Sequence, residues 1–233
     1  MKIFFRITAV AIIILTLTSS GSVRQKPLNL ILFIGDGMGV SHVYAAMTVS
    51  GSTMTFPAFP VTGFSRTYSA SSYSTDSAAG GTALATGENN RMISVRPDST
   101  VLVTLLEHAR AAGKSTGIVC TSSLTDATPA TFAAHVPLRY DYRRIAGWYA
   151  AGAAEVFIGG GLKYFEPETD STGSYKQSED VISMLESAGY DITYDLDAFV
   201  ASGAGRIAGF MSDGDMPRLF EGRDARYLAR ATA

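Results

Sequence analysis

The chain has 233 residues, of which 46% are hydrophobic and 17% are charged. This is the composition of a globular protein with a sizeable core, and it excludes an intrinsically disordered chain. The formal net charge of -2 at pH 7 provides no basic field to gather polyanions, so we expect no nucleic-acid partner. A single cysteine, Cys120, excludes a disulfide within the chain. This cysteine lies in a short apolar run, which predicts a buried thiol without a chemical role rather than a reactive one.

Residues 1–23 have the three-part layout of a secretory signal. Lys2 and Arg6 precede an apolar run over residues 7–17, and small polar residues follow at 19–22. The run is shorter than the roughly 20 residues that a helix needs to cross a bilayer, which favours a cleaved signal over the alternative, an uncleaved anchor. We therefore expect an exported protein, periplasmic or extracellular, with no stable membrane insertion after cleavage.

Strands alternate with helices along the rest of the chain. Residues 28–34 form an apolar run, interrupted by Asn29 and closed by a Gly-Asp-Gly turn, as in a strand buried on both faces. Further strands are predicted over residues 115–123, 153–161 and 205–215, and helices over 40–50, 101–113 and 178–189, the last with Ser178 as its N-cap. Residues 167–178 are the best candidate for a surface loop. The order predicts an α/β fold over residues 27–233, with a mostly parallel central sheet and helices on both faces.

Polar residues and glycines fall just beyond the ends of the predicted strands. They are Asp36, Ser122, Ser123, Asp126 and the glycines at 159–161. Because open α/β sheets bind ligands outside the carboxyl ends of their strands, we expect the functional site at this edge of the sheet.

The stretch TDSAAGGTALATG, residues 75–87, places Ser77 at the expected start of a helix with almost no bulky side chains. The first N–H groups and the positive dipole end of such a helix favour an anion such as phosphate and would stabilise a serine alkoxide. The small residues at 78–81 let other backbone or a substrate come close. A nucleophilic serine also needs a base or a metal cation, and neither a G-x-S-x-G turn nor a suitably spaced histidine is present. From these residues alone, Ser77 is either a nucleophile or an ordinary N-cap or core hydroxyl.

Three further residues offer oxygen ligands, and one offers a guanidinium. Asp36 follows the first predicted strand, where it is suited to hold a hard cation or, alternatively, to bond its own backbone in a turn. Asp126 and Thr128 lie two residues apart, with Arg139 downstream. The oxygen pair suits magnesium, directly or through water, and the guanidinium offers paired donors to two phosphate oxygens.

Taken together and in this order, FIGDGMG, YSTDSAAGGTALATG, TDATPATFAAHVPLR, FIGGGLKYF and MSDGDMPR resemble the alkaline phosphatase family. The resemblance spans about residues 29–218. It implies a metal-dependent phosphomonoesterase with two zinc ions and one magnesium ion on an α/β core. The family is often dimeric, so a homodimer is one expected assembly of the full-length form.

The resemblance also implies roles for individual residues. Asp36 would bridge one zinc and the magnesium, and Ser77 would be the nucleophile that becomes phosphoserine, later released by a zinc-activated water. Arg139 would hold the phosphoryl oxygens, with Asp76 placed to orient it. Thr128 would bind magnesium directly, and Asp126 would do so closely or through a water. Many relatives carry histidine at the position of Asp126, and others carry aspartate. An aspartate at this position favours magnesium as the bound metal.

The sequence departs from the family in its remaining metal ligands. Neither an Asp-His pair nor a D-x-x-x-H arrangement occurs in the chain, and Asp36 cannot alone supply the roughly four ligands that zinc needs. We therefore expect an amino-terminal portion of a longer protein, incomplete at its C-terminus, with the remaining ligands beyond Ala233 and weak or no activity of its own. The alternatives are a noncatalytic phosphate-binding remnant and a related esterase acting on diesters or sulfate esters.

Overall fold

A computed structural model of the chain describes residues 29–50, 59–168 and 179–232. The chain divides into two units, residues 1–35 and residues 36–233, and the second contains all the helices and strands described below. The predicted signal segment, residues 1–23, lies outside the described residues. Within the described ranges, no helix has both the length and the apolar character needed to cross a bilayer.

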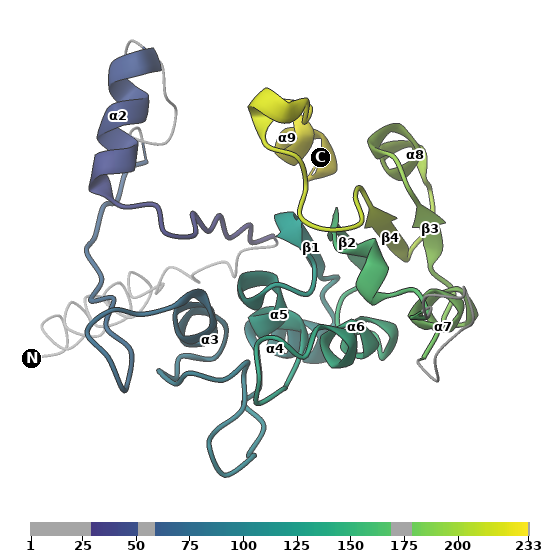
Figure 1. The fold of residues 1–233 in the computed structure, drawn as a ribbon, viewed down its shortest axis with the longest axis horizontal. Helices are drawn as coiled ribbons and strands as arrows, with labels where there is room; N and C mark the ends of the chain where they lie inside the picture. Colours follow the sequence, from purple (N-terminus) through teal and green to yellow (C-terminus); the bar gives the residue numbers. More distant parts are fainter. Residues whose placement is uncertain (1–28, 51–58, 169–178, 233) are drawn as a thin grey trace, which may run out of the picture. The chain divides into compact units, whose positions relative to one another are not determined.

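The second unit is organised around a parallel sheet of four strands (Figure 1). The strands are β1 (Gly117–Ser123), β2 (Val156–Gly160), β3 (Asp191–Thr193) and β4 (Ile207–Phe210), in the spatial order β1-β2-β4-β3. Three of them confirm the strands predicted over residues 115–123, 153–161 and 205–215. Strand β3 has only three residues, too few to show a hydrophobic period in the sequence.

Eight α-helices are assigned among the described residues: α2 (Val40–Ser50), α3 (Ser77–Thr86), α4 (Leu105–Ala111), α5 (Ala127–Ala133), α6 (Tyr142–Ala150), α7 (Val181–Ser187), α8 (Leu196–Ala201) and α9 (Tyr227–Ala231). Two short 3-10 turns, η2 (Leu162–Tyr164) and η3 (Leu219–Glu221), accompany them. Helix α2 confirms the prediction for residues 40–50.

Two predicted helices begin later than expected because of their caps. Helix α4 starts after Thr104, whose side chain forms a reciprocal capping box with Glu107, so the preceding residues 101–103 stay outside it. Helix α7 starts after Asp180, whose carboxylate accepts a hydrogen bond from the Ser183 N–H at 3.0 Å. The prediction of Ser178 as the cap is therefore wrong, and Ser178 itself lies outside the described residues.

Both faces of the sheet are covered, which confirms the predicted fold class. Alternate side chains of β2 point to opposite faces: Phe157 packs with residues of α5, α6 and α7, whereas Ile158 packs with Phe199 of α8 and Tyr227 of α9. Figure 1 shows α5, α6 and α7 on one side of the strands and α8 and α9 on the other. A parallel sheet buried in this way explains why its strands read as continuous apolar runs.

The strand predicted over residues 28–34 is not present as a strand. Residues 29–34 have no regular structure, and Leu30 and Phe33 are 73% and 71% exposed. An apolar run favours burial, but a strand also needs a neighbour whose backbone groups pair with its own, and none of the ladders formed by the described residues includes this segment.

Of the glycines at 159–161, which were predicted to lie just beyond a strand, Gly159 and Gly160 lie within the sheet and Gly161 lies directly after β2. Gly159 and Gly160 belong to β2 and are buried. A Cβ atom on Gly160 would lie 2.0 Å from the Gly214 carbonyl oxygen, and one on Gly161, whose φ is +97°, would lie 2.0 Å from the Ser123 hydroxyl. These glycines let neighbouring backbone approach β2 closely, so nothing about them requires a ligand.

Candidate active site

Helix α3 begins at Ser77, but the residue that caps it is Asp76. The Asp76 side chain accepts a hydrogen bond from the Ala79 N–H at 2.9 Å, and its carbonyl accepts one from the Gly80 N–H at 2.9 Å. The alternative of Ser77 as N-cap is therefore wrong, because Ser77 is the first helical residue. Among the described residues, no group accepts a hydrogen bond from the N–H of Ser77 or Ala78. The helix thus presents two free donors next to the partly exposed Ser77 hydroxyl.

The small residues of α3 allow it to pack closely against α5. A Cβ atom on Gly81 would lie 2.6 Å from the hydroxyl and 3.1 Å from the methyl group of Thr131, a buried residue of α5. At Gly80, one position earlier, a Cβ atom would meet nothing closer than 4.0 Å. Part of the small-residue run is therefore explained by the close contact between α3 and α5 at Gly81 and Thr131.

The guanidinium of Arg139 joins these two helices. Its Nη1 donates to Asp76 Oδ2 at 3.2 Å, and its Nη2 donates to Asp126 Oδ1 at 3.3 Å. The Arg139 side chain is 22% exposed, and its Nε is buried without a hydrogen-bond partner among the described residues. A buried donor left unpaired is rare in folded proteins and marks a place where a partner is expected.

A second contact brings Asp36 to the start of α5. The Thr128 hydroxyl donates to Asp36 Oδ2 at 3.0 Å, although the two residues are 92 positions apart. Asp126, two residues before Thr128, caps α5 by accepting a hydrogen bond from the Ala127 N–H at 2.8 Å. The predicted site residues thus form one chain of contacts, from Asp36 through the first turn of α5 to Arg139 and on to Asp76, which adjoins Ser77.

The surroundings of this group shift the pKa values of nearby side chains. Burial raises the pKa of Tyr142, and the negative charges of Tyr164 and Asp126 raise it further against the opposing charge of Arg139. The Cys120 thiol on β1 is enclosed by protein although the residue is only partly buried, and burial raises its pKa to about 12. This supports the prediction of an unreactive thiol.

The oxygen donors of the site suit magnesium better than zinc. Asp36, Asp126 and Thr128 offer two carboxylates and a hydroxyl, which are hard ligands of the kind that magnesium binds. Zinc sites typically include nitrogen or sulfur, yet no group of three or more His, Cys, Asp and Glu side chains in the described ranges could hold a metal ion. His42 bonds the start of its own helix through the Gly39 N–H, and His135 is buried against other partners. Within the described residues, the oxygen donors of Asp36, Asp126 and Thr128 match the ligand chemistry of magnesium and lack the nitrogen or sulfur that is typical of zinc.

One residue without a predicted role is prominent in the structure. His135 is buried between Ser94 and Glu107, four positions before Arg139. Part of the signal was in the sequence, since TLLE at 104–107 is a capping-box pattern that fixes Glu107 at a helix start. The proximity of Glu107 to His135, 28 positions away, required the fold.

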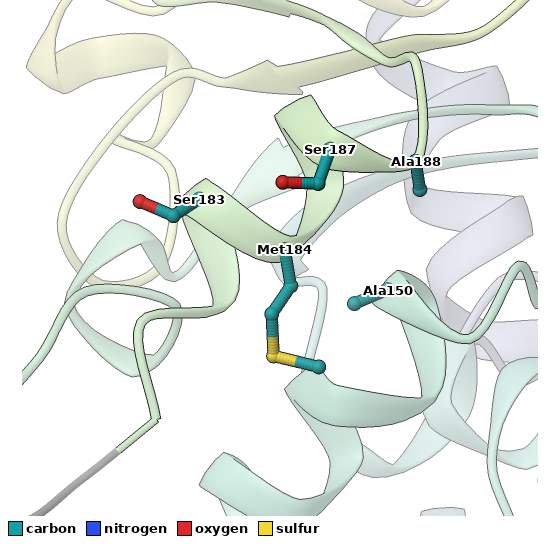
Figure 2. A pocket seen from close by; sticks show the side chains of 5 residues that line it. All are labelled: Ala150, Ser183, Met184, Ser187 and Ala188. Carbon is teal, nitrogen blue, oxygen red and sulfur yellow. The ribbon is translucent and has the colours of Figure 1, made fainter.

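A surface hollow lies between α6 and α7 (Figure 2), lined by Ala150, Ser183, Met184, Ser187 and Ala188. No charged side chain lines it, and none of the candidate site residues contributes to it. Because recognition of a phosphate needs cationic or N–H donors, this hollow is not the phosphate-binding site.

The chain resembles one family of known proteins. The family model described as Alkaline phosphatase matches residues 27–230. The repressible alkaline phosphatase of Saccharomyces cerevisiae is 32% identical over 233 residues, covering 88% of this chain and 41% of the yeast protein. The structure of alkaline phosphatase from the Antarctic bacterium TAB5 has a TM-score of 0.81 and 33% identity, covering 89% of this chain and 60% of that one.

A His-to-Asp variant of the TAB5 enzyme, with magnesium bound in its M3 site, has a TM-score of 0.75 at 32% identity and covers 84% of this chain and 56% of that one. The chain thus spans 41% to 60% of the length of these three proteins.

Proposed function

Because this chain belongs to the alkaline phosphatase family, we propose that it carries the nucleophile and the phosphate-binding side of a metal-dependent phosphomonoesterase. The observation that supports this most directly is the position of Arg139. Its guanidinium contacts both the carboxylate next to Ser77 and the carboxylate that caps α5. One cationic side chain thereby connects the candidate nucleophile to the candidate metal ligands.

Ser77 is the proposed nucleophile. Its hydroxyl oxygen attacks phosphorus, the bond from phosphorus to the ester oxygen breaks, and the alcohol leaves with a proton, so that phosphoserine remains until water hydrolyses it. The free N–H groups of Ser77 and Ala78 and the positive end of the α3 dipole stabilise negative charge at the hydroxyl and the phosphoryl oxygens.

Arg139 is the proposed phosphate-binding cation. A guanidinium can donate to two phosphoryl oxygens at once, and its unpaired Nε is a further donor. Asp76 holds Nη1 at 3.2 Å and so fixes the direction of the guanidinium. The same carboxylate caps α3 through its other oxygen, so Asp76 couples the position of the nucleophile to that of the cation.

Magnesium is the metal that these residues are suited to hold. We assign its binding to Asp36, Asp126 and Thr128, whose oxygens lie around the first turn of α5. When bound, the ion supplies positive charge that offsets the charge of the phosphoryl group. The TAB5 variant with aspartate in place of a histidine has magnesium bound in its M3 site, which supports magnesium as the metal proposed for this chain. No group of three or more His, Cys, Asp and Glu side chains among the described residues could hold a metal ion, and the oxygen ligands assigned here do not suit zinc, so we expect the 233-residue chain to turn over weakly or not at all.

Phosphorylation of the chain tests the proposal. After incubation with p-nitrophenyl phosphate and magnesium, acid quenching and mass spectrometry should find phosphate on Ser77 and none on a Ser77→Ala variant. Arg139→Ala should lose calorimetric binding of inorganic phosphate. Arg96→Ala should keep it, because Arg96 pairs with Glu88 at the surface and such pairs contribute little.

Three other results would favour an alternative or contradict part of the proposal. Binding of phosphate through Arg139 without any phosphoserine would favour the noncatalytic phosphate-binding alternative. Turnover comparable to that of a complete family member, abolished by Ser77→Ala, would show that the expected weak activity is wrong. Phosphate binding that survives Arg139→Ala would contradict the assignment of the site.

Export and assembly belong to the same proposal. The signal-like residues 1–23 support secretion, which a fusion to a reporter active only outside the cytoplasm would test. We also propose that the protein forms a homodimer, which sedimentation would reveal.

A further inference from the structure

His135 makes two hydrogen bonds that both call for a proton on its ring. Its side chain is only 3% exposed, with Nδ1 at 2.9 Å from the Ser94 carbonyl oxygen and Nε2 at 3.0 Å from Glu107 Oε1. A carbonyl and a carboxylate are both acceptors, and a neutral imidazole has only one N–H. With Glu107 ionised, as its lowered pKa favours, both contacts are satisfied at once only by the imidazolium, which forms charge-assisted hydrogen bonds of the stronger kind.

Each neighbouring element contributes a defined group to this ring. Helix α4 provides Glu107, whose other oxygen accepts from the Thr104 N–H at 2.7 Å. Partial burial raises the pKa of Glu107, but the hydrogen bonds from Thr104 and His135 outweigh it and hold the pKa below its ordinary value. Helix α6 provides the uncharged ring of Trp148, edge-on at 4.9 Å. Arg110 of α4 lines the same small cavity as Glu107 and Trp148, and it donates to the Gly152 carbonyl.

The segment anchored by this ring is the one that carries Arg139. Residues 134–141 connect α5 to α6, and the next residue after His135, Val136, exchanges two backbone hydrogen bonds with Ile93, at 3.0 and 3.1 Å. Pro137 follows and fixes its own φ angle. The anchored part is therefore separated from Arg139 by only two residues, 137 and 138, so a shift of His135 is passed on to the guanidinium.

We propose that His135, in its charged form and paired with Glu107, is the positioning residue for Arg139. It does not touch the phosphate itself. It fixes the backbone from which Arg139 reaches Asp76 and Asp126, so the binding of an anion depends on the two hydrogen bonds that hold the His135 ring. The inference rests on the proposed role of Arg139 in phosphate binding.

The charge on His135 can be observed without any ligand. Trp148 is the only tryptophan in the chain, and a protonated imidazole quenches indole fluorescence more than a neutral one. We expect Trp148, whose ring lies 4.9 Å from that of His135, to emit less in the wild type than in His135→Gln at one fixed pH. Glu107→Gln, which removes the partner charge and keeps the shape of the side chain, should also emit more than the wild type. Equal emission from the wild type and His135→Gln would overturn the inference.

The link to Arg139 is tested with sulfate, a dianion that does not titrate near neutral pH. We expect His135→Gln to bind sulfate roughly tenfold to a hundredfold more weakly than the wild type, as a displaced positioning group does. Glu107→Gln should shift binding in the same direction, and Arg96→Ala should not. Circular dichroism of each variant verifies that it is folded.

The outcomes separate this inference from the proposed function. If Arg139→Ala abolishes sulfate binding while His135→Gln leaves the affinity unchanged, the positioning role is wrong and the phosphate-binding role stands. If Arg139→Ala leaves binding unchanged, or the wild type binds no sulfate, the proposed role of Arg139 fails and the positioning role fails with it.

Discussion

Replacing Gly81 with alanine tests whether α3 and α5 pack as closely as the structure describes. The added Cβ atom would lie 2.6 Å from the Thr131 hydroxyl oxygen and 3.1 and 3.3 Å from its Cγ2 and Cβ. Thr131 is fully buried, and its hydroxyl donates to the Thr128 carbonyl at 2.8 Å, so it cannot move away freely. Overpacking of a filled interior costs about 1–3 kcal/mol. Gly80→Ala is the matched control, because the atoms nearest to its added Cβ atom would lie 4.0 Å away.

Both substitutions gain about 1 kcal/mol of helix propensity, so their difference isolates the steric cost. We expect Gly81→Ala to be about 1–3 kcal/mol less stable than Gly80→Ala, which corresponds to a melting temperature roughly 2–12 °C lower for a chain of this size. Thermal and urea unfolding followed by circular dichroism would measure it.

A double-mutant cycle makes the test specific to the contact. Thr131→Ala removes the atoms that clash, so Gly81→Ala should lose its extra cost in that background. Equal melting temperatures for Gly80→Ala and Gly81→Ala, or a cost at Gly81 that persists without the Thr131 side chain, would refute the close packing of α3 on α5. The small-residue run would then need another explanation.

Three further outcomes are expected. Because the pKa of Glu107 is lowered in the folded state from a reference value of 4.5, its ionised form contributes stability at higher pH that is lost as the pH falls below about 4.5. Glu107→Gln should therefore flatten the acid limb of the stability curve measured by urea titration, and an unchanged limb would contradict the pairing with His135. The Cys120 thiol, with its pKa raised to about 12, should resist iodoacetamide at pH 8 in the native protein and react in urea, whereas rapid native labelling would argue against its enclosure. Tyr149→Phe removes the hydroxyl that donates to the Leu124 carbonyl at 2.9 Å inside the core. We expect the free energy of unfolding, measured with denaturant, to fall by about 1–3 kcal/mol. An unchanged free energy of unfolding would mean that water or another donor replaces the hydroxyl.

Local chemistry made much of the fold readable from the sequence. Apolar runs ended by glycines and polar residues predicted three of the four strands, because strands covered on both faces lack polar positions. The run at 28–34 has the same character and forms no strand, since apolarity encodes a preference for burial and does not supply a pairing partner. Caps were only partly readable. Asp76 and Ser77 are both good N-caps, and so are Ser178 and Asp180. The residue types alone therefore could not show which member of each pair caps the helix.

The sequence by itself determined which residue types could act: a serine before a run of small residues, oxygen ligands two apart, and one arginine downstream. Only the tertiary structure decided that they meet. The contacts between Arg139 and Asp76 and between Thr128 and Asp36 span 63 and 92 positions. The close packing of α3 against α5 depends on the absence of a Cβ atom at Gly81. Short-range patterns are set by neighbouring residues, whereas contacts across such separations result from the packing of the whole core, which no local stretch encodes.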